Sequence, residues 1–279
     1  MNTSTQTSSV SFVSDAQRLM RSIAFDDAVV RFAADMRAFY GRHESASEIF
    51  ADVGQFAIVA SIATFPDRLT EAQLCKVLSA GSLASRRRVR AHLARLQGAG
   101  LVQILRDPSD LRARLIAPCA RLEDLLDQWV RALAGAGLQV LGLDAALLQR
   151  QHLARFYLAQ VMAAHRAGYS AFTATPNITR LTNLSRGHAL VLELLSAASV
   201  TGDLEFEFSR RGFAQHYGVS RTHVIDLLGE CENLGLVAVR GRRVALSDGF
   251  RAEARLWVGV NFVLAAAALE GRLLLAMER

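Results

Sequence analysis

Apolar residues recur at three-and-four spacing along several long stretches of this chain, the spacing that places them on one face of an α-helix. One such stretch runs from Ser14 to Tyr40, with Ser14 as the expected helix cap. Another covers residues 143–165, and two more surround Trp129 and Trp257. The pattern therefore predicts long helices at the beginning and end of each half of the chain.

Shorter apolar runs on either side of turn residues interrupt the helical pattern in each half. Residues 101–118 form two such runs around Asp107-Pro108-Ser109-Asp110, whose proline and aspartates favour a turn. Residues 236–246 form two runs around Gly241. Each half should therefore contain a β-hairpin. Gly100 stands just before the first hairpin, where a helix commonly ends on a left-handed residue.

The two halves of the chain resemble each other in sequence. Residues 85–102 read SRRRVRAHLARLQGAGLV and align with residues 220–237, which read SRTHVIDLLGECENLGLV. Further along, Trp129 falls on Trp257. The only sizeable change in the offset between the halves lies at the hairpin, where loop tips tolerate insertions and deletions. The chain is therefore expected to contain the same unit twice.

Each unit has the order helix, helix, helix, strand, turn, strand, helix, which is that of a winged helix-turn-helix. We therefore predict a mainly α fold with small β-hairpin wings, in which tandem winged helix-turn-helix domains are joined and flanked by long helices and related by a pseudo-two-fold axis. We call the two winged helices the first and second heads. The predicted boundaries are a disordered tail over 1–13, a first unit over 14–140 with its winged helix at about 45–120, and a second unit over 141–279 with its winged helix at about 186–248.

Charge and motifs narrow the function. The formal net charge of +6 and the pI of about 9.9 favour a polyanionic partner such as nucleic acid or an acidic membrane surface. The three cysteines are far apart, and no HExxH, GxGxxG, Walker or GxSxG motif occurs. We therefore expect neither a metal, nor a cofactor, nor enzymatic activity.

The apolar run from Trp257 to Leu269 falls short of the roughly 20 residues that span a bilayer, so it should be a buried helix. The polar N-terminus lacks the basic and apolar regions of a secretory signal. We therefore expect a cytoplasmic protein without a membrane segment.

Arginines gather on the helix before the first hairpin, with no acidic residue between positions 85 and 97. An arginine-rich face is often only a solvated surface. Here, however, the guanidinium groups should repel one another unless something anionic lies opposite, and the helix occupies the place of a helix that enters the DNA major groove. Arg87 and Ala91 should point away from a buried face centred on Val89. Bidentate arginines read guanine in that groove.

Residues 69–118 resemble the winged helix core of MarR-type transcriptional regulators, whose wing typically reads Asp-Pro-x-Asp-Arg-Arg. Here the wing reads Asp-Pro-Ser-Asp-Leu-Arg over 107–112, so Leu111 replaces the first wing arginine. The resemblance implies that Arg112 reaches the minor groove and that the major groove is read by Arg87, Arg88, Arg90 and Ala91. MarR-type protomers dimerise through their terminal helices, so two units in one chain resemble a fused dimer.

The two heads should not contribute equally to DNA binding. Residues 1–140 carry 17 basic and 14 acidic residues and residues 141–279 carry 15 and 12, so both halves have a charge of +3. In the second head, however, Arg221 is accompanied by Asp226, Glu230 and Glu232, and carboxylates disfavour contact with phosphates. The candidate DNA-binding residues are Arg86, Arg87, Arg88, Arg90, Ala91, Arg95, Arg112, Arg114, Arg221, Thr222, His223, Arg240, Arg242 and Arg243.

The sequence thus predicts a regulator of transcription that binds double-stranded DNA sequence-specifically, reads it mainly with the first head, and could respond to a small-molecule effector. One chain could act as a fused dimer, or two chains could pair as a homodimer. Two alternatives remain open. One is a plasmid replication initiator with two winged helix domains, and the other is a tandem winged helix module that binds proteins.

Overall fold

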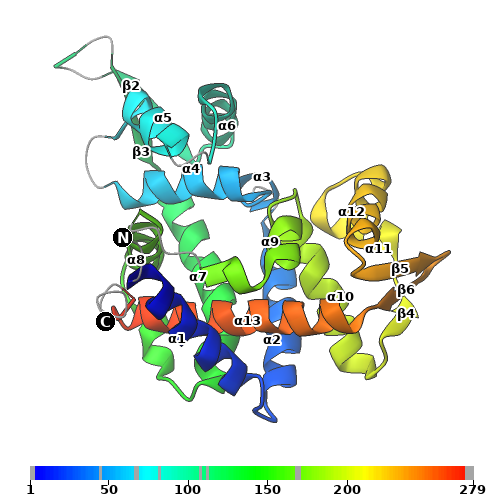
Figure 1. The fold of residues 1–279 in the computed structure, drawn as a ribbon. Helices are drawn as coiled ribbons and strands as arrows, with labels where there is room; N and C mark the ends of the chain where they lie inside the picture. The colour runs from blue at the N-terminus through cyan, green and yellow to red at the C-terminus, as the bar shows by residue number, and fades with distance from the viewer. Residues whose placement is uncertain are drawn as a thin grey trace.

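The computed structural model describes residues 4–43, 46–65, 69–80, 83–106, 109–110, 113–166 and 171–273. The fold is mainly helical, with two small antiparallel sheets (Figure 1). The first half contains α1 (Ser4–Leu19), α2 (Phe25–Arg42), α3 (Ala46–Ile49), α4 (Val53–Thr64), β1 (Leu69–Thr70), α5 (Glu71–Ala80), α6 (Arg86–Gly98), β2 (Val102–Arg106), β3 (Arg114–Pro118) and α7 (Ala120–Val140). The second half contains the 3₁₀ helices η1 (Ala145–Gln149) and η2 (Ala171–Ala174), and α8 (Leu153–Arg166), α9 (Pro176–Thr182), α10 (Gly187–Thr201), β4 (Glu205–Glu207), α11 (Arg210–Tyr217), α12 (Arg221–Asn233), β5 (Val237–Arg240), β6 (Arg243–Leu246) and α13 (Asp248–Leu269).

One order of elements occurs twice. The series α4-β1-α5-α6-β2-β3-α7 matches the series α10-β4-α11-α12-β5-β6-α13. The strand orders β1-β3-β2 and β4-β6-β5 also match, and every pairing is antiparallel. Both predicted hairpins are therefore confirmed. In the first hairpin, Asp107 and Pro108 of the predicted turn lie outside the described residues, as does Arg112.

Matching caps begin and end the helix before each hairpin. The Ser85 hydroxyl accepts a hydrogen bond from the backbone N–H of Arg88 at the start of α6, and Ser220 caps α12 in the same way. Gly100 and Gly235 follow the two helices with φ of +67° and +66°. The left-handed stop predicted at Gly100 is confirmed, and a glycine adopts it without the steric cost of a Cβ atom.

The long helix α13 forms part of the core, where it packs against α1, α7 and α8 (Figure 1). Phe262 of α13 lies edge-on to Phe25 and Phe32 of α2, with ring centroids 6.2 and 5.4 Å away. Across α7, a Cβ atom added to Gly137 would come within 2.8 Å of the Phe262 ring. Gly137 therefore allows α7 to approach closely enough for three helices to meet at one aromatic side chain.

The halves exchange helices as they pack. Helix α2 of the first half lies against α10 of the second, and α8 of the second half lies against α4 of the first. Each head is therefore supported by a helix from the other half, and the buried residues form one continuous core. The predicted boundary at residue 140 follows the repeat along the sequence, but the packing crosses it.

The single helix predicted from Ser14 to Tyr40 is wrong. Helix α1 already begins at Ser4, inside the predicted tail, and the chain turns between α1 and α2 with Ser22 N–H bonded to the Leu19 carbonyl. The turn lets α1 pack on α13, where Ala16 lies close to Gly259, while α2 packs on α7. Tertiary packing thus decides a break that the apolar spacing does not reveal.

The helical stretch predicted over 143–165 is also divided, into η1 and α8. His152 between them has a left-handed φ of 52°, which an α-helix does not contain. A carboxylate accepts a backbone hydrogen bond at the start of each helix. Asp144 accepts from the Ala146 N–H at 2.8 Å in η1, and Asp127 of α7 accepts from the Ala154 N–H at 2.7 Å in α8. The second contact fixes the start of α8 against α7.

Helix α13 is long and apolar enough, by length and composition, to cross a membrane. In the structure, 67% of its most apolar stretch is buried, as is typical of a helix in a protein core. This agrees with the buried helix expected over Trp257–Leu269.

Replacing Phe262 with alanine should destabilise both halves together, because its ring joins α13 of the second half to α2 and α7 of the first. We expect a loss of about 3–5 kcal/mol, the range for deleting a buried phenylalanine ring. Urea unfolding followed by circular dichroism measures the loss, with Ile225→Ala as an exposed control within about 0.5 kcal/mol of wild type. Two separate transitions, with only one of them shifted, would contradict the shared core.

Candidate nucleic-acid interface

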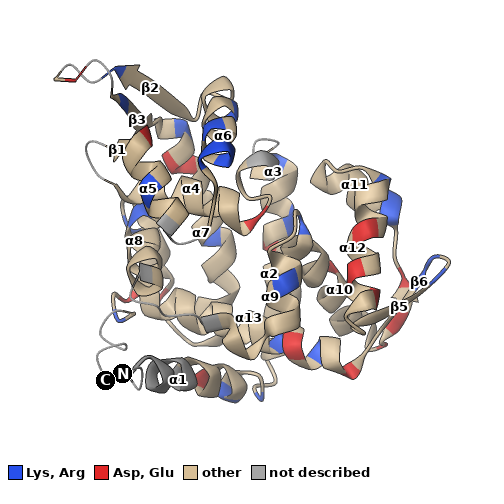
Figure 2. Ribbon diagram, turned by 45° about the horizontal axis from the view of Figure 1, so that its top comes forward, with Lys and Arg blue, Asp and Glu red and all other residues tan. Residues whose placement is uncertain are grey.

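Helix α6 presents an exposed face and a buried face. Arg86, Arg87, Ala91 and Arg95 are exposed. Figure 2 shows how the basic residues gather at the start of the helix. The buried side chains are Val89, His92, Leu93 and Leu96. The predicted direction of Arg87 and Ala91 is confirmed, because they point away from the face that anchors the helix.

Arg88 is held by an ion pair within the first head. Its guanidinium group binds Asp52, the residue before α4. Asp52 also caps α4 by accepting from the backbone N–H groups of Gly54 and Gln55, at 2.9 and 3.0 Å. One mostly buried carboxylate thus joins the start of α4 to α6.

Arg90 is held in a similar way by Glu71, the first residue of α5. The Arg90 Nε atom lies 2.6 Å from Glu71 Oε1, and Arg114 of strand β3 lies 3.1 Å from Glu71 Oε2. Glu71 is only 8% exposed, so it connects α5, α6 and the hairpin at a partly desolvated site. For Arg88 and Arg90, the anion expected opposite the guanidinium group therefore comes from within the first head itself.

The remaining arginines of α6 form what we call the open arginine face: Arg86, Arg87 and Arg95. Within the described part of the chain, none of the three makes an ion pair or a side-chain hydrogen bond. Arg106 at the end of β2 is likewise exposed and without such a contact among those residues. Sequence reasoning missed Arg106, although its place at the end of a hairpin strand was a usable signal.

The exposed face of α12 differs from that of α6. Thr222, Ile225 and Asp226 are exposed there, and acidic side chains replace the basic ones (Figure 2). Two of the acids predicted to oppose DNA are engaged elsewhere. Glu230 lies 2.6 Å from Arg180, and Glu232 accepts from the Val239 N–H at 2.8 Å. Asp226 is left as the acid that disfavours phosphate at this face.

Two arginines of the hairpin in the second head form ion pairs within that head. Arg243 lies 2.7 Å from Glu205, and Arg242 lies 3.6 Å from Glu207. Arg240 and Arg221 are exposed and make no ion pair within the described ranges. The structure thus brings fewer free cations together in this head than the sequence suggests.

A short chain of hydrogen bonds joins the two heads. Asp52, which forms an ion pair with Arg88 of α6, directly follows Ala51 in the chain. The Ala51 carbonyl accepts a hydrogen bond from the backbone N–H of Arg186, at 2.9 Å. The Ser185 carbonyl then accepts from Nε2 of His223 on α12, at 2.7 Å. His223 is half-buried and engaged in this contact, so its predicted role at DNA is limited.

The corner at Arg186 is unusual for its backbone. Arg186 has a left-handed φ of 64°, and its buried side chain donates through Nε to the Tyr217 carbonyl at 3.1 Å. At the next residue, Gly187, an added Cβ atom would lie 1.7 Å from the Leu181 carbonyl oxygen. A non-glycine residue in this conformation persists only where its surroundings hold it. The corner is thus a fixed joint between the heads.

Two buried histidines are kept neutral. Burial lowers the pKa of His92 to about 4, and the nearby Arg95 contributes in the same direction. Burial likewise lowers the pKa of His188 to about 4, and its Nε2 atom shares a hydrogen bond of 2.6 Å with the Tyr40 hydroxyl. Neither ring nitrogen of His92 has a hydrogen-bond partner among the described residues. His92 is therefore a destabilising group that the fold tolerates.

The described residues contain no group of three or more His, Cys, Asp or Glu side chains placed to hold a metal ion. All three cysteines are free thiols, with Cys75 and Cys231 buried and Cys119 partly exposed.

Replacing His92 with leucine, the residue at the matching position 227, should stabilise the protein by about 1–3 kcal/mol at pH 7, because two unpartnered buried nitrogens are removed. The gain should grow as the pH falls from 6.5 to 4. In that range the unfolded histidine binds a proton and the folded one does not, so the wild type loses stability as the pH is lowered. His188 contributes the same trend to both proteins.

Urea midpoints of wild type and His92→Leu at several pH values measure this difference. Equal dependence on pH in the two proteins would show that His92 gains a partner or a proton in the folded state.

Comparison with protein families, with curated proteins and with solved structures gave no match in any of the three. A function for this surface is therefore argued from its exposure, contacts and charge.

Proposed function

We propose that the chain is a regulator of transcription that binds double-stranded DNA through two winged helix-turn-helix heads, with the first head as the main reader. The repeated element order supports this, since in both halves a helix with a serine cap and a glycine stop leads directly into an antiparallel hairpin. In such domains this second helix enters the major groove and the hairpin lies beside it.

The open arginine face is the observation that carries the proposal. Arg86, Arg87 and Arg95 are exposed on one helix and have no internal anion within the described chain. A phosphate backbone supplies the missing anions, and release of its counterions favours binding. Arg87 points straight away from the core, so it is placed to read a guanine by two hydrogen bonds.

The paired arginines have a different part in this proposal. Arg88, Arg90 and Arg114 fix α6 relative to α4, α5 and the hairpin. They position the reading helix, and their partly exposed guanidinium groups can still face phosphates at a distance. Arg112 at the minor groove stays a prediction from the family resemblance. A small-molecule effector and the pairing of two chains stay predictions from the sequence.

Genome-wide mapping of bound sites tests the proposal. The exchanged helices and the Arg186 joint hold the heads at one separation. The bound sites should therefore share two half-sites at a single spacing, about one helical turn or a multiple of it. Sites with one half-site and no fixed neighbour would show that the second head does not read DNA.

A protein partner for the second head is the competing function, and Ile225 favours it. This side chain is 52% exposed at the position that Arg90 occupies in the first head, with Asp226 beside it. An apolar and acidic face suits protein contact better than phosphate. Unchanged DNA affinity but loss of a co-purifying protein in Ile225→Arg would support this function.

Replacing Arg87 with alanine should weaken binding to the mapped site by about 5- to 150-fold, equivalent to 1–3 kcal/mol, and relax the preference at one base pair. Arg95→Ala should instead weaken binding to all sequences and lower the slope of log affinity against log salt by about 1. Fluorescence anisotropy at several salt concentrations measures both effects. Thr222→Ala is the matched control on α12, and a loss equal to that of Arg87→Ala would show that the two heads read DNA equally.

A further inference from the structure

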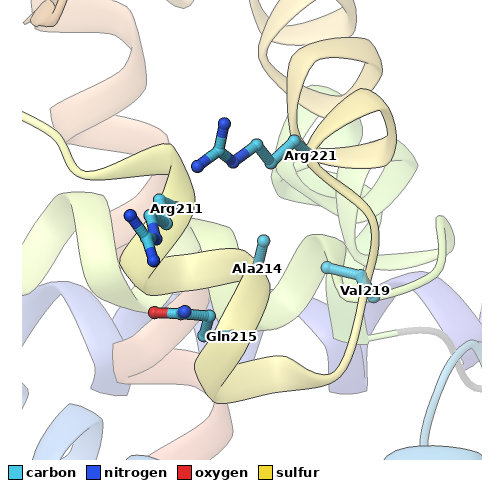
Figure 3. Close-up of a pocket in the computed structure, with 5 residues that line it drawn as sticks. All are labelled: Arg211, Ala214, Gln215, Val219 and Arg221. Atoms are coloured by element: carbon cyan, nitrogen blue, oxygen red, sulfur yellow. The ribbon is translucent and has the colours of Figure 1, made fainter.

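The second head contains an open pocket between α11 and the start of α12. Its volume is about 360 Å³. This is within the usual size range of ligand sites. The residues that line it are Arg211, Ala214, Gln215, Val219 and Arg221 (Figure 3).

Two of these residues carry positive charge that the protein does not neutralise. Arg211 and Arg221 are exposed, and neither makes an ion pair or a side-chain hydrogen bond within the described residues. Other arginines of the same head do have partners: Arg210 donates to the Gly241 carbonyl at 2.6 Å, and Arg243 binds Glu205. Arg211 and Arg221 differ from these two arginines, and they share this lack of a partner with Arg240 of the hairpin, which lies outside the pocket lining.

The arrangement of the lining favours an anion. Arg211 and Arg221 come from different helices and extend over the same hollow, with Ala214 between them and Gln215 at one side (Figure 3). Ala214 is buried, so the pocket has a small apolar floor under a charged rim. Two guanidinium groups over one hollow repel each other in water, and an anion between them converts that repulsion into attraction.

We propose that this pocket binds a phosphate group. Two guanidinium groups and an amide offer many N–H donors, which match the several terminal oxygens of a phosphate better than the two oxygens of a carboxylate. The volume exceeds the need of a single phosphate group, so it also admits the ester substituents of a nucleotide or a sugar phosphate.

The first head does not repeat this pocket chemistry. The second residue of α11 is Arg211, whereas the second residue of α5 is Ala72. The first residue of α6 is Arg86, which matches Arg221. The site therefore belongs to the second head, whose α12 lacks the arginines that read bases in the first.

The phosphate can come from the DNA backbone or from a free phosphorylated molecule. The first source rests on the proposed function. In that case the pocket would hold the DNA backbone and fix the orientation of the second head, because phosphate contacts position a protein and carry no sequence information themselves. The second source would make the pocket a regulatory ligand site.

Titration of the full chain with inorganic phosphate, at constant ionic strength set with chloride, tests the site. NMR of the arginine Nε–H groups should show saturable shifts at Arg211 and Arg221. Arg211→Gln and Arg221→Gln should each weaken this binding about tenfold, the effect of losing one charge-assisted contact. Arg251→Gln, which replaces an exposed arginine at the start of α13, is the matched control. Shifts at Arg211 no larger than those at Arg251 would overturn the proposal.

The salt dependence of binding to a random-sequence duplex then separates the two sources. A slope of log affinity against log salt lower by about 1 in each pocket variant assigns the phosphate to DNA. An unchanged slope, with inorganic phosphate binding lost, assigns it to a free phosphorylated molecule. Phosphate binding in a chain that binds no DNA at all would overturn the proposed function and leave the pocket in place.

Discussion

The exchange of helices between the two halves is the constraint on which the rest of the structure depends. Because α2 lies against α10 and α8 lies against α4, neither head can rotate without uncovering apolar surface in the other half. Phe262 lies where α13 meets α2 and α7 in this core. In a dimer of separate chains such an arrangement depends on protein concentration. Within one chain it is intramolecular, so the separation of the heads is a property of the fold.

Charge within the first head is organised by two carboxylates that come from outside the arginine helix. Asp52 forms an ion pair with Arg88, and Glu71 forms ion pairs with Arg90 and Arg114. These contacts connect α6 to α4, α5 and the hairpin. Exposed ion pairs contribute little to stability. Both carboxylates are largely buried, however, so leaving either one unpaired would cost more. The arginines of α6 therefore fall into two groups: those in ion pairs position the helix, and the others face outward.

The parts of the fold set by local chemistry could be predicted from the sequence, and the parts set by distant contacts could not. The hairpins, the stop at Gly100 and the outward direction of Arg87 follow from turn residues and helical spacing. The break between α1 and α2 leaves no such signal, because it exists to let α1 cover α13. The partnership of Arg90 with Glu71 spans 19 positions, and helical spacing does not describe such a contact. Charge counted along a helix consequently overstates the charge that the folded helix presents.

The difference between the heads follows from the same distinction between engaged and free charge. The sequence assigns the second head three acids on α12, yet Glu230 and Glu232 are bound internally. Among the described residues, its arginines without an ion pair include Arg211 and Arg221 at the pocket rim and Arg240 on the hairpin. If both heads touch one duplex, the fixed joint at Arg186 makes each contact depend on the other. Contact of the second head with the DNA backbone would then orient α6 of the first head on the same duplex.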